Sequence, residues 1–251
     1  MSPTRYHHGD LKAALIDGAI ELIAERGVRG FSLAELSRRA GVTVAAPYRH
    51  FADRDELLAA VGVHAVHTFG QAVAADIGAG DIEAGDIEAG DTPQRRAAAM
   101  VKGYVVFAAE QRPLFEVLFG ANLDKSRFPE LREAWQPLDD LLDAAVDALC
   151  PDDAATAVVL GDALQAVAHG YAMLLLDGSY GDAPGTVRDV AAQAANAALA
   201  VIAGRAALTV GGTGPDETSP DETGPDETGA PNRAGAAGTS SISSTSDASG
   251  G

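Results

Sequence analysis

The segment that covers residues 44–51, VAAPYRHF, combines side chains that could read the edges of DNA bases. At about 100° per residue of an α-helix, Val44, Ala45 and Tyr48 share one face, and Arg49 lies at its edge. A small apolar side chain can contact a thymine methyl group in the major groove, and a guanidinium can pair with guanine. The segment therefore predicts a recognition helix that approaches base edges between flanking phosphates.

Two predicted helices precede this segment and would have to position it. Apolar residues recur at helical spacing over about 10–26. Ser32 followed by Glu35 matches a capping box for a second helix over about 33–40. Gly41 then ends that helix, because glycine adopts the left-handed conformation at little cost. The pattern predicts a three-helix unit in which the glycine turn leads directly into the recognition helix.

Three residues bear on how the recognition helix begins and which way it faces. Thr43 is expected to cap it. Pro47 lacks an N–H, but it falls within about the first turn, where few internal hydrogen bonds exist, so a small cost is predicted. Pro47 and Phe51 share the face opposite the base-reading side chains and are expected to point inward.

The run GVTVAAPYRHFADRDELLAAV resembles the helix-turn-helix signature of the TetR/AcrR family of repressors, and the match covers about residues 10–62. It departs from the pattern at Pro47, where many members have leucine, and at Arg54, where lysine is commoner. The resemblance implies one set of side chains that contact phosphates and another that faces bases. The implied phosphate contacts are Ser32, Thr43, Tyr48, His50 and Arg54, and the implied base contacts are Val44, Ala45 and Arg49.

The function that follows from this resemblance is a ligand-responsive, DNA-binding transcriptional regulator. It would be a repressor that binds a pseudo-palindromic operator as a dimer and is released by a small apolar molecule. The alternative is a helical interaction or ligand-sensing protein whose helix-turn-helix does not act on DNA. From the residue types alone, Tyr48 and His50 could instead pack the core, and Arg38 and Arg39 could form a solvated face.

The charge of the chain is unevenly distributed. The net charge is −18, yet residues 1–62 contain eight basic and eight acidic residues, so the remainder carries the whole excess. An acidic body repels DNA non-specifically, which leaves the neutral N-terminal unit as the surface that binds it.

Residues 63–208 are predicted to form a helical body that binds the ligand and dimerises. The WHG-type C-terminal domain of some TetR regulators is similar to the RRAAAMVKGYVVFAAEQRPLFEVLF and AVAHGYAMLLL runs. The fold class predicted is therefore all-α, with the three-helix unit at the N-terminus. The predicted body helices cover about residues 55–77, 95–110, 113–119, 130–149, 154–176 and 186–208.

The predicted helix over 154–176 is apolar on nearly every side, which predicts a helix that is buried all round. Asp162, Gln165 and His169 interrupt it, so it is not expected to cross a membrane. Together with the helix over 186–208, it is expected to form a four-helix bundle with a second copy of the chain.

Aromatic and methionine residues of the body are candidates for contact with the apolar effector, although the type of any single one is more typical of an ordinary core. His169 could likewise be a core histidine with a satisfied hydrogen bond. The candidate effector-binding residues are Phe69, Met100, Tyr104, Phe107, Phe115, Phe119, Trp135, His169 and Met173.

Neither catalytic nor metal chemistry is predicted. The sequence has no G-x-S-x-G, P-loop or H-E-x-x-H motif, and His64 and His67 have no evident third ligand. No enzyme activity and no cofactor are therefore expected. Cys150 is the only cysteine, and the first residues lack an apolar stretch, so a cytoplasmic location is expected.

Two segments of low complexity complete the predicted organisation. Residues 78–92 contain a five-residue Gly-Asp repeat and are expected to form a flexible loop, with a weak acidic cation site as a minor alternative. Residues 209–251 repeat G/S-PDET and are expected to form a disordered acidic tail. The predicted domains are thus 1–62, 63–208 and the tail.

Overall fold

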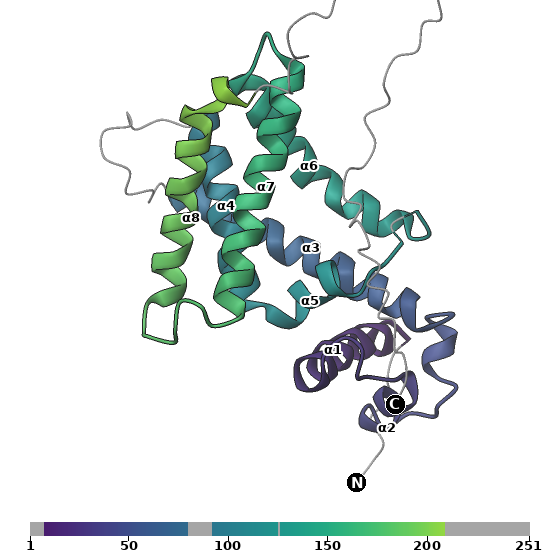
Figure 1. Cartoon of the computed structure of the whole chain (residues 1–251). Coiled ribbons are helices and arrows are strands. Elements are labelled where there is room, and N and C mark those ends of the chain that lie inside the picture. The colour runs from purple at the N-terminus through teal and green to yellow at the C-terminus, as the bar shows by residue number, and fades with distance from the viewer. Residues whose placement is uncertain (1–7, 80–91, 125, 209–251) are drawn as a thin grey trace, which may run out of the picture. The chain divides into compact units, whose positions relative to one another are not determined.

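The computed structural model describes residues 8–79, 92–124 and 126–208, in which helices occur and no strand does (Figure 1). This confirms the all-α prediction for the part of the chain described. The predicted tail and residues 80–91 of the predicted loop lie outside it. The helices are α1 (His8–Arg26), α2 (Leu33–Arg39), η1 (Pro47–Arg49), α3 (Arg54–Ala79), α4 (Pro93–Glu110), α5 (Arg112–Gly120), α6 (Pro129–Leu149), α7 (Ala154–Leu176), α8 (Thr186–Ala203) and η2 (Arg205–Ala207).

The turn after α2 has the geometry that the sequence predicts. Gly41 has a φ of +67°, in the left-handed region that favours glycine. The Val42 N–H donates to the Ser37 carbonyl at 3.0 Å, and the Gly41 N–H donates to the Arg38 carbonyl at 3.3 Å. These two bonds form a Schellman motif, which ends α2 and directs the chain into residues 44–51.

Side-chain caps explain where several of the other helices begin. Thr92 Oγ1 accepts from the Arg95 N–H at 3.3 Å, and Pro93 then occupies the first position of α4. Asp153 Oδ1 accepts from the Thr156 N–H at 2.9 Å at the start of α7. Short polar residues therefore define these boundaries, as capping chemistry dictates.

The central element of the body is α4, which contacts α3, α5, α6, α7 and α8. Its approach to α3 depends on Gly103, because a Cβ added there would lie 3.0 Å from the Cα of Val73. Both α3 and α4 contribute to one continuous apolar core that also includes α1 and α2. Since α3 belongs to both the N-terminal unit and the body, movement of the body has a direct route to the unit.

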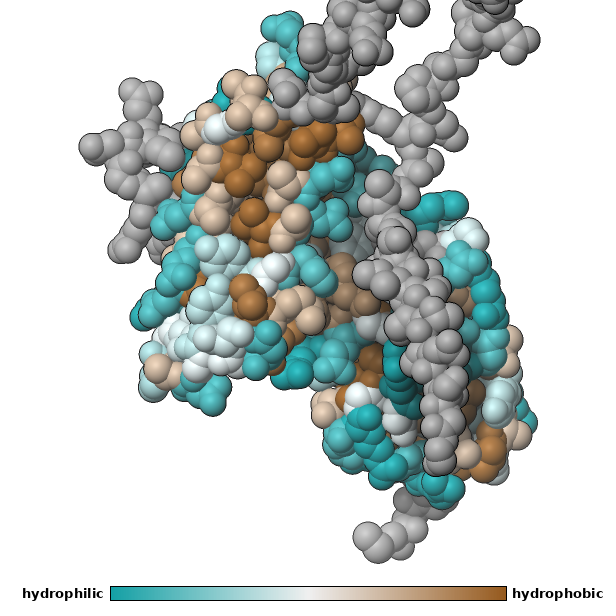
Figure 2. Space-filling model, in the orientation of Figure 1, coloured by the Kyte–Doolittle hydropathy of each residue, from teal (hydrophilic) through white to brown (hydrophobic). Residues whose placement is uncertain are grey.

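The prediction for α7 was wrong in one respect, because this helix is not buried all round. Its buried side chains form one stripe, whereas Val158, Met173 and Leu174 are 50%, 46% and 45% exposed. Figure 2 shows apolar surface over the face that α7 and α8 share. Composition reports that a helix is apolar but not what covers it, and within one chain α7 and α8 cover only part of each other.

Two described helices, α3 and α7, are long and apolar enough to cross a membrane by length and composition. In α3, 50% of the most apolar 18-residue stretch is buried in the protein, compared with 22% of the corresponding stretch of α7. The core position of α3 accounts for its composition, whereas the exposed face of α7 still needs a covering surface.

Candidate nucleic-acid interface

The predicted α-helix over residues 44–51 is a turn followed by the 3-10 helix η1. The Ala46 N–H donates to the Thr43 carbonyl at 2.9 Å, and the Arg49 N–H donates to the Ala46 carbonyl at 3.2 Å. Pro47 cannot donate to Thr43 and its ring excludes an α-helical approach, so the tighter turn forms instead. Pro47 occupies the first position of η1, where its missing N–H has no helical partner to lose. The cap predicted for Thr43 was wrong, because its carbonyl and not its side chain accepts from the segment.

The directions of the side chains nevertheless match the prediction. Pro47 and Phe51 are buried, whereas Val44 and Tyr48 are 53% and 54% exposed. Ala45 and Arg49 are also exposed. The 3-10 segment thus presents the predicted set outward, and the alternative that Tyr48 packs the core does not hold. His50 is intermediate, with its ring centroid 6.5 Å from that of Phe51.

Ser32 lies at the start of α2, where only half of the expected capping box forms. Its Oγ accepts from the Glu35 N–H at 3.3 Å. The Glu35 carboxylate does not return to the cap but pairs with Arg26, at 2.9 Å and 2.7 Å. Ser32 is exposed, so its hydroxyl proton can still be donated to a phosphate.

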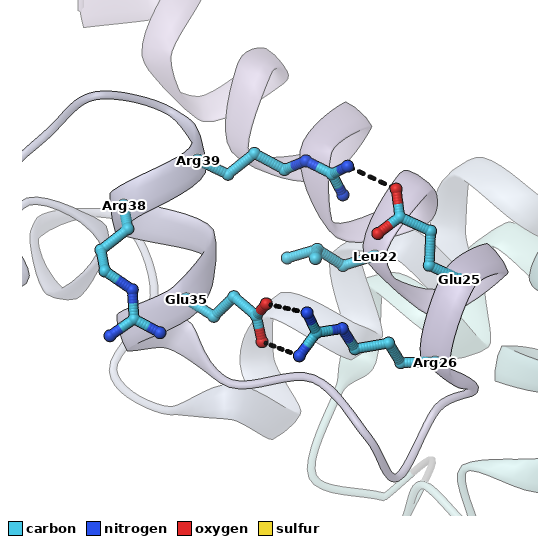
Figure 3. A pocket seen from close by; sticks show the side chains of 6 residues that line it. All are labelled: Leu22, Glu25, Arg26, Glu35, Arg38 and Arg39. Atoms are coloured by element: carbon cyan, nitrogen blue, oxygen red, sulfur yellow. Dashed lines mark hydrogen bonds and ion pairs between the residues drawn. The ribbon is translucent and has the colours of Figure 1, made fainter.

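Two ion pairs brace α1 against α2 around a surface hollow of about 310 Å³ (Figure 3). One is the two-pronged Arg26–Glu35 pair, and the other joins Arg39 to Glu25. The Arg39 hydrogen bond holds the pKa of Glu25 below its ordinary value. Two of the arginines that line the hollow are already paired with carboxylates. These pairs join the two helices, and the hollow is therefore not a site for an anion.

Arg54 makes internal contacts at the beginning of α3. Its guanidinium donates to the Val28 carbonyl and lies 4.9 Å from the centroid of the Phe31 ring. A phosphate contact from Arg54 would compete with these contacts, so its implied role stays a prediction.

Three exposed arginines of the N-terminal unit have no hydrogen bond or ion pair within the described ranges. They are Arg29, Arg38 and Arg49. The sequence predicts that Arg49 faces bases and that Arg38 could belong to a solvated face, and it assigns no role to Arg29. Their freedom could not be deduced from the sequence, because it depends on which arginines the neighbouring carboxylates occupy.

Arg127 is a residue to which sequence reasoning assigned no role, and its guanidinium pairs with both Asp53 and Asp55. These partners lie 74 and 72 residues away in the chain. A contact at that separation leaves no local pattern in a single sequence.

Seven of the predicted effector-binding residues come together in one aromatic cluster inside the body. Each ring centroid lies 4.8–6.5 Å from that of a neighbour. Met100 is buried nearby on α4, whereas Met173 lies apart on the exposed face of α7. The aromatic cluster consists of Phe69, Tyr104, Phe107, Phe115, Phe119, Trp135 and His169.

One polar pair lies within the aromatic cluster. The Tyr104 hydroxyl is 2.9 Å from Nδ1 of His169. Burial raises the pKa of Tyr104 and lowers the pKa of His169, so the neutral pair is favoured. His169 is thus a histidine with a satisfied hydrogen bond that also lines the predicted effector region.

An apolar groove of about 380 Å³ opens on the protein surface between α3 and α6. Its floor includes Val66 and Val73, close in sequence to Phe69 of the aromatic cluster, and Leu138, close to Trp135. None of its lining residues was predicted to bind the effector. The lining consists of Val66, His67, Gly70, Gln71, Val73, Ala74, Ile77, Ala134, Pro137, Leu138 and Leu141.

The described residues contain no group of three histidine, cysteine, aspartate or glutamate side chains placed to hold a metal ion. Cys150 is buried, and its thiol is free.

Two protein families match this chain. Residues 15–61 match the family described as bacterial regulatory proteins, tetR family, and residues 97–200 match the tetracyclin repressor-like C-terminal domain. The two matches cover 47 and 104 residues, or 151 of the 251. The chain belongs to the TetR family.

Individual TetR-type proteins show how far the likeness extends. The HTH-type transcriptional regulator BetI of Brucella anthropi is 33% identical over 97 residues, which are 39% of this chain and 44% of BetI. The match thus spans less than half of this curated relative.

Two solved structures have the same fold. A protein of unknown function from Rhodococcus sp. RHA1 has 27% identity and a TM-score of 0.59, over 79% of this chain and 98% of that protein. AibR, in complex with isovaleryl coenzyme A and operator DNA, has 17% identity and a TM-score of 0.54, over 74% of this chain and 96% of AibR. At this identity, the likeness to AibR shows the fold alone.

Proposed function

We propose that this TetR-family chain is a ligand-responsive DNA-binding regulator that represses by occupying a pseudo-palindromic operator. The observation that carries the proposal is the outward presentation of Val44, Ala45, Tyr48 and Arg49 directly after the Gly41 turn. A braced unit that exposes small apolar groups beside an unpaired guanidinium suits a major groove lined by phosphates. The AibR structure, which contains operator DNA, supports this use of the fold.

The proposed contacts divide by chemistry. Val44 and Ala45 face thymine methyl groups, and Arg49 pairs with guanine. The hydroxyl and imidazole groups beside them position the protein by binding phosphates, which gives affinity without sequence information. The phosphate-binding residues in this proposal are Ser32, Thr43, Tyr48, His50 and Arg54.

A second copy of the chain covers the exposed face of α7 and α8 in this proposal. Val158, Met173 and Leu174 expose apolar surface there, which a soluble monomer rarely leaves uncovered. Asp162 and Gln165 are exposed on the same helix, which disfavours a lipid environment and suits a protein interface. A dimer also supplies two copies of residues 44–51, the recognition segment, which a pseudo-palindromic operator needs.

The effector in this proposal is a small apolar molecule that separates the rings of the aromatic cluster. The cluster draws on α3, α4, α5, α6 and α7, so rings cannot move apart without moving helices. Because α3 continues from the recognition segment into this cluster, such movement changes the angle at which the segment meets DNA. AibR is a protein of this fold that holds isovaleryl coenzyme A as well as operator DNA, which supports a regulator that responds to a small molecule.

A protein that acts on chromosomal DNA belongs in the cytoplasm, so we place the chain there. We assign it no catalytic role and no cofactor, in keeping with a family of transcriptional regulators.

The test is a gel shift of the full chain with the DNA immediately upstream of its own gene, across a salt titration. We expect a specific complex whose affinity falls steeply with salt, because phosphate contacts release counterions. An affinity that stays flat with salt would contradict the phosphate contacts. No DNA complex, together with tight binding of another protein, would instead favour an interaction protein with an inactive helix-turn-helix.

A further inference from the structure

Arg127 lies just before α6, in the segment that follows α5, yet its guanidinium reaches the first residues of α3. It pairs with the Asp53 carboxylate and, at 3.5 Å, with Oδ2 of Asp55. One side chain of the body therefore bridges two carboxylates on either side of the residue where α3 begins.

The carboxylates that it holds lie at the start of α3, directly after the recognition segment. Oδ1 of Asp53 accepts from the Glu56 N–H at 2.9 Å and so caps α3, two residues after the buried Phe51. Arg54, between the two carboxylates, binds the Val28 carbonyl. Three consecutive residues thus join the recognition segment, the α1–α2 turn and the body.

Arg127 is also anchored on its own side. Its backbone N–H donates to the Asp124 carbonyl at 3.0 Å, and its guanidinium lies 5.0 Å from the centroid of the neighbouring Phe128 ring. Phe128 is buried at the start of α6. The Arg127 side chain is half-exposed, and two carboxylates and the Phe128 ring together set the position of its guanidinium.

We infer that Arg127 is a positioning residue for DNA recognition, which sets the angle of the recognition segment without touching DNA itself. This inference rests on the proposed DNA-binding function. It also gives the effector a route, since α6 carries Trp135 of the aromatic cluster and begins beside Arg127. Displacing the start of α6 would pull on Asp53 and Asp55 and rotate the segment that precedes them.

A direct phosphate contact by Arg127 is the competing explanation. Two carboxylates already occupy its guanidinium, and their negative charge disfavours a phosphate at the same place. The two explanations differ in how removal of Arg127 alters the salt dependence of binding, which makes them separable.

The experiment compares operator affinity and its salt dependence in the full-length wild type, Arg127→Gln and Arg127→Lys, which keeps a positive charge opposite both carboxylates. Arg132→Gln, which removes an exposed arginine from α6 five residues further along the chain, is the matched control. Arg127→Gln should weaken operator binding by about two- to tenfold, as expected for an exposed ion-pair network. Arg127→Lys should recover part of that loss, and Arg132→Gln should bind like the wild type.

The slope of log affinity against log salt decides between the explanations. A positioning role leaves it unchanged in Arg127→Gln, whereas loss of a phosphate contact lowers it by about one for each contact. A lowered slope, or an Arg127→Lys variant that binds no better than Arg127→Gln, would overturn the inference.

Hydrogen exchange of the DNA-free protein provides a readout that does not depend on the proposed function. Arg127→Gln should speed the exchange of the amides of Glu56 and Leu57 at the start of α3, and Arg127→Lys should slow it again. Unchanged exchange would overturn the inference even if operator binding falls. If the wild type binds no DNA, the proposed function is refuted. Hydrogen exchange would still test whether Arg127 holds the start of α3 in place.

Discussion

Large apolar side chains remain exposed in two regions of the described protein, and the two regions differ in what surrounds them. Val44 and Tyr48 belong to the recognition segment, whereas Val158, Met173 and Leu174 belong to α7. The first pair is accompanied by unpaired guanidinium groups, and the α7 residues lie among small and apolar neighbours on a helix without a basic residue. Exposure alone is therefore ambiguous, and the neighbouring charge indicates a polyanion in one case and a second apolar face in the other.

The strongest way to break this comparison is to place the same carboxylate in both regions. Leu174→Glu buries a charge in the proposed interface, so we expect monomers and a loss of operator affinity of about 100- to 10,000-fold, the range by which bivalence raises affinity. Val44→Glu should leave the dimer intact and abolish specific binding by repelling phosphates. Sedimentation velocity and fluorescence anisotropy measure the two effects. Dimeric Leu174→Glu protein would show that α7 is not the interface.

Tyr48→Ala tests whether the larger exposed side chain of the recognition segment anchors a phosphate. A hydrogen bond to a charged group contributes about 1.5–3 kcal/mol, so binding should weaken by roughly 10- to 100-fold for operator and scrambled DNA alike. Tyr48→Phe separates the hydroxyl from the ring and should lose most of the same affinity. A loss confined to the operator would mean that Tyr48 reads bases instead.

The local parts of this molecule could be predicted from the sequence, and the parts that depend on distant partners could not. Gly41 specifies its own backbone conformation, and the cap at Ser32 needs only the next few residues. By contrast, the Glu35 carboxylate is drawn to Arg26, which comes from another helix. Local propensity cannot rank such competing partners, because their distances are set by packing.

In the candidate site, too, the local features could be predicted from the sequence and the contacts between distant residues could not. The outward set at residues 44–49 follows from spacing and survives the change from an α-helix to a 3-10 helix, since both turn through a similar angle over so few residues. The sequence does not predict that change, because apolar spacing over so few residues does not distinguish a 3-10 turn from an α-helical turn. Arg127 was missed because its partners lie more than 70 residues away.

Val44→Ala is a milder change than the carboxylate and asks what the small apolar face reads. Removing two methyl groups should cost about 1 kcal/mol at the one or two base pairs that Val44 contacts and little elsewhere. Competition between operator variants with single base-pair changes measures this preference, with Ala24→Gly on α1 as an exposed control away from the segment. An equal loss for every variant would place Val44 outside the reading face.

The smallest expected effect concerns the aromatic cluster, which lies in the interior rather than in either exposed region. Burial lowers the pKa of His169, so the unfolded chain takes up a proton at this residue before the folded protein does. The contribution of neutral His169 to the stability of the folded protein is therefore complete above its unfolded pKa of about 6.5. It is lost as the pH falls from that value through the lower pKa of the folded protein. Thermal melts between these limits should show the wild type losing stability and His169→Asn losing less.

Tyr104→Phe is the control for that measurement, because it removes the 2.9 Å hydrogen bond while His169 stays buried among the same rings. Its melting temperature should be lower than that of the wild type at every pH, but its dependence on pH should keep the same sign. If His169→Asn retains the full wild-type dependence, the titrating group lies elsewhere. The acid sensitivity of the body would then have its source outside the aromatic cluster, and the neutral Tyr104–His169 pair would contribute only its hydrogen bond.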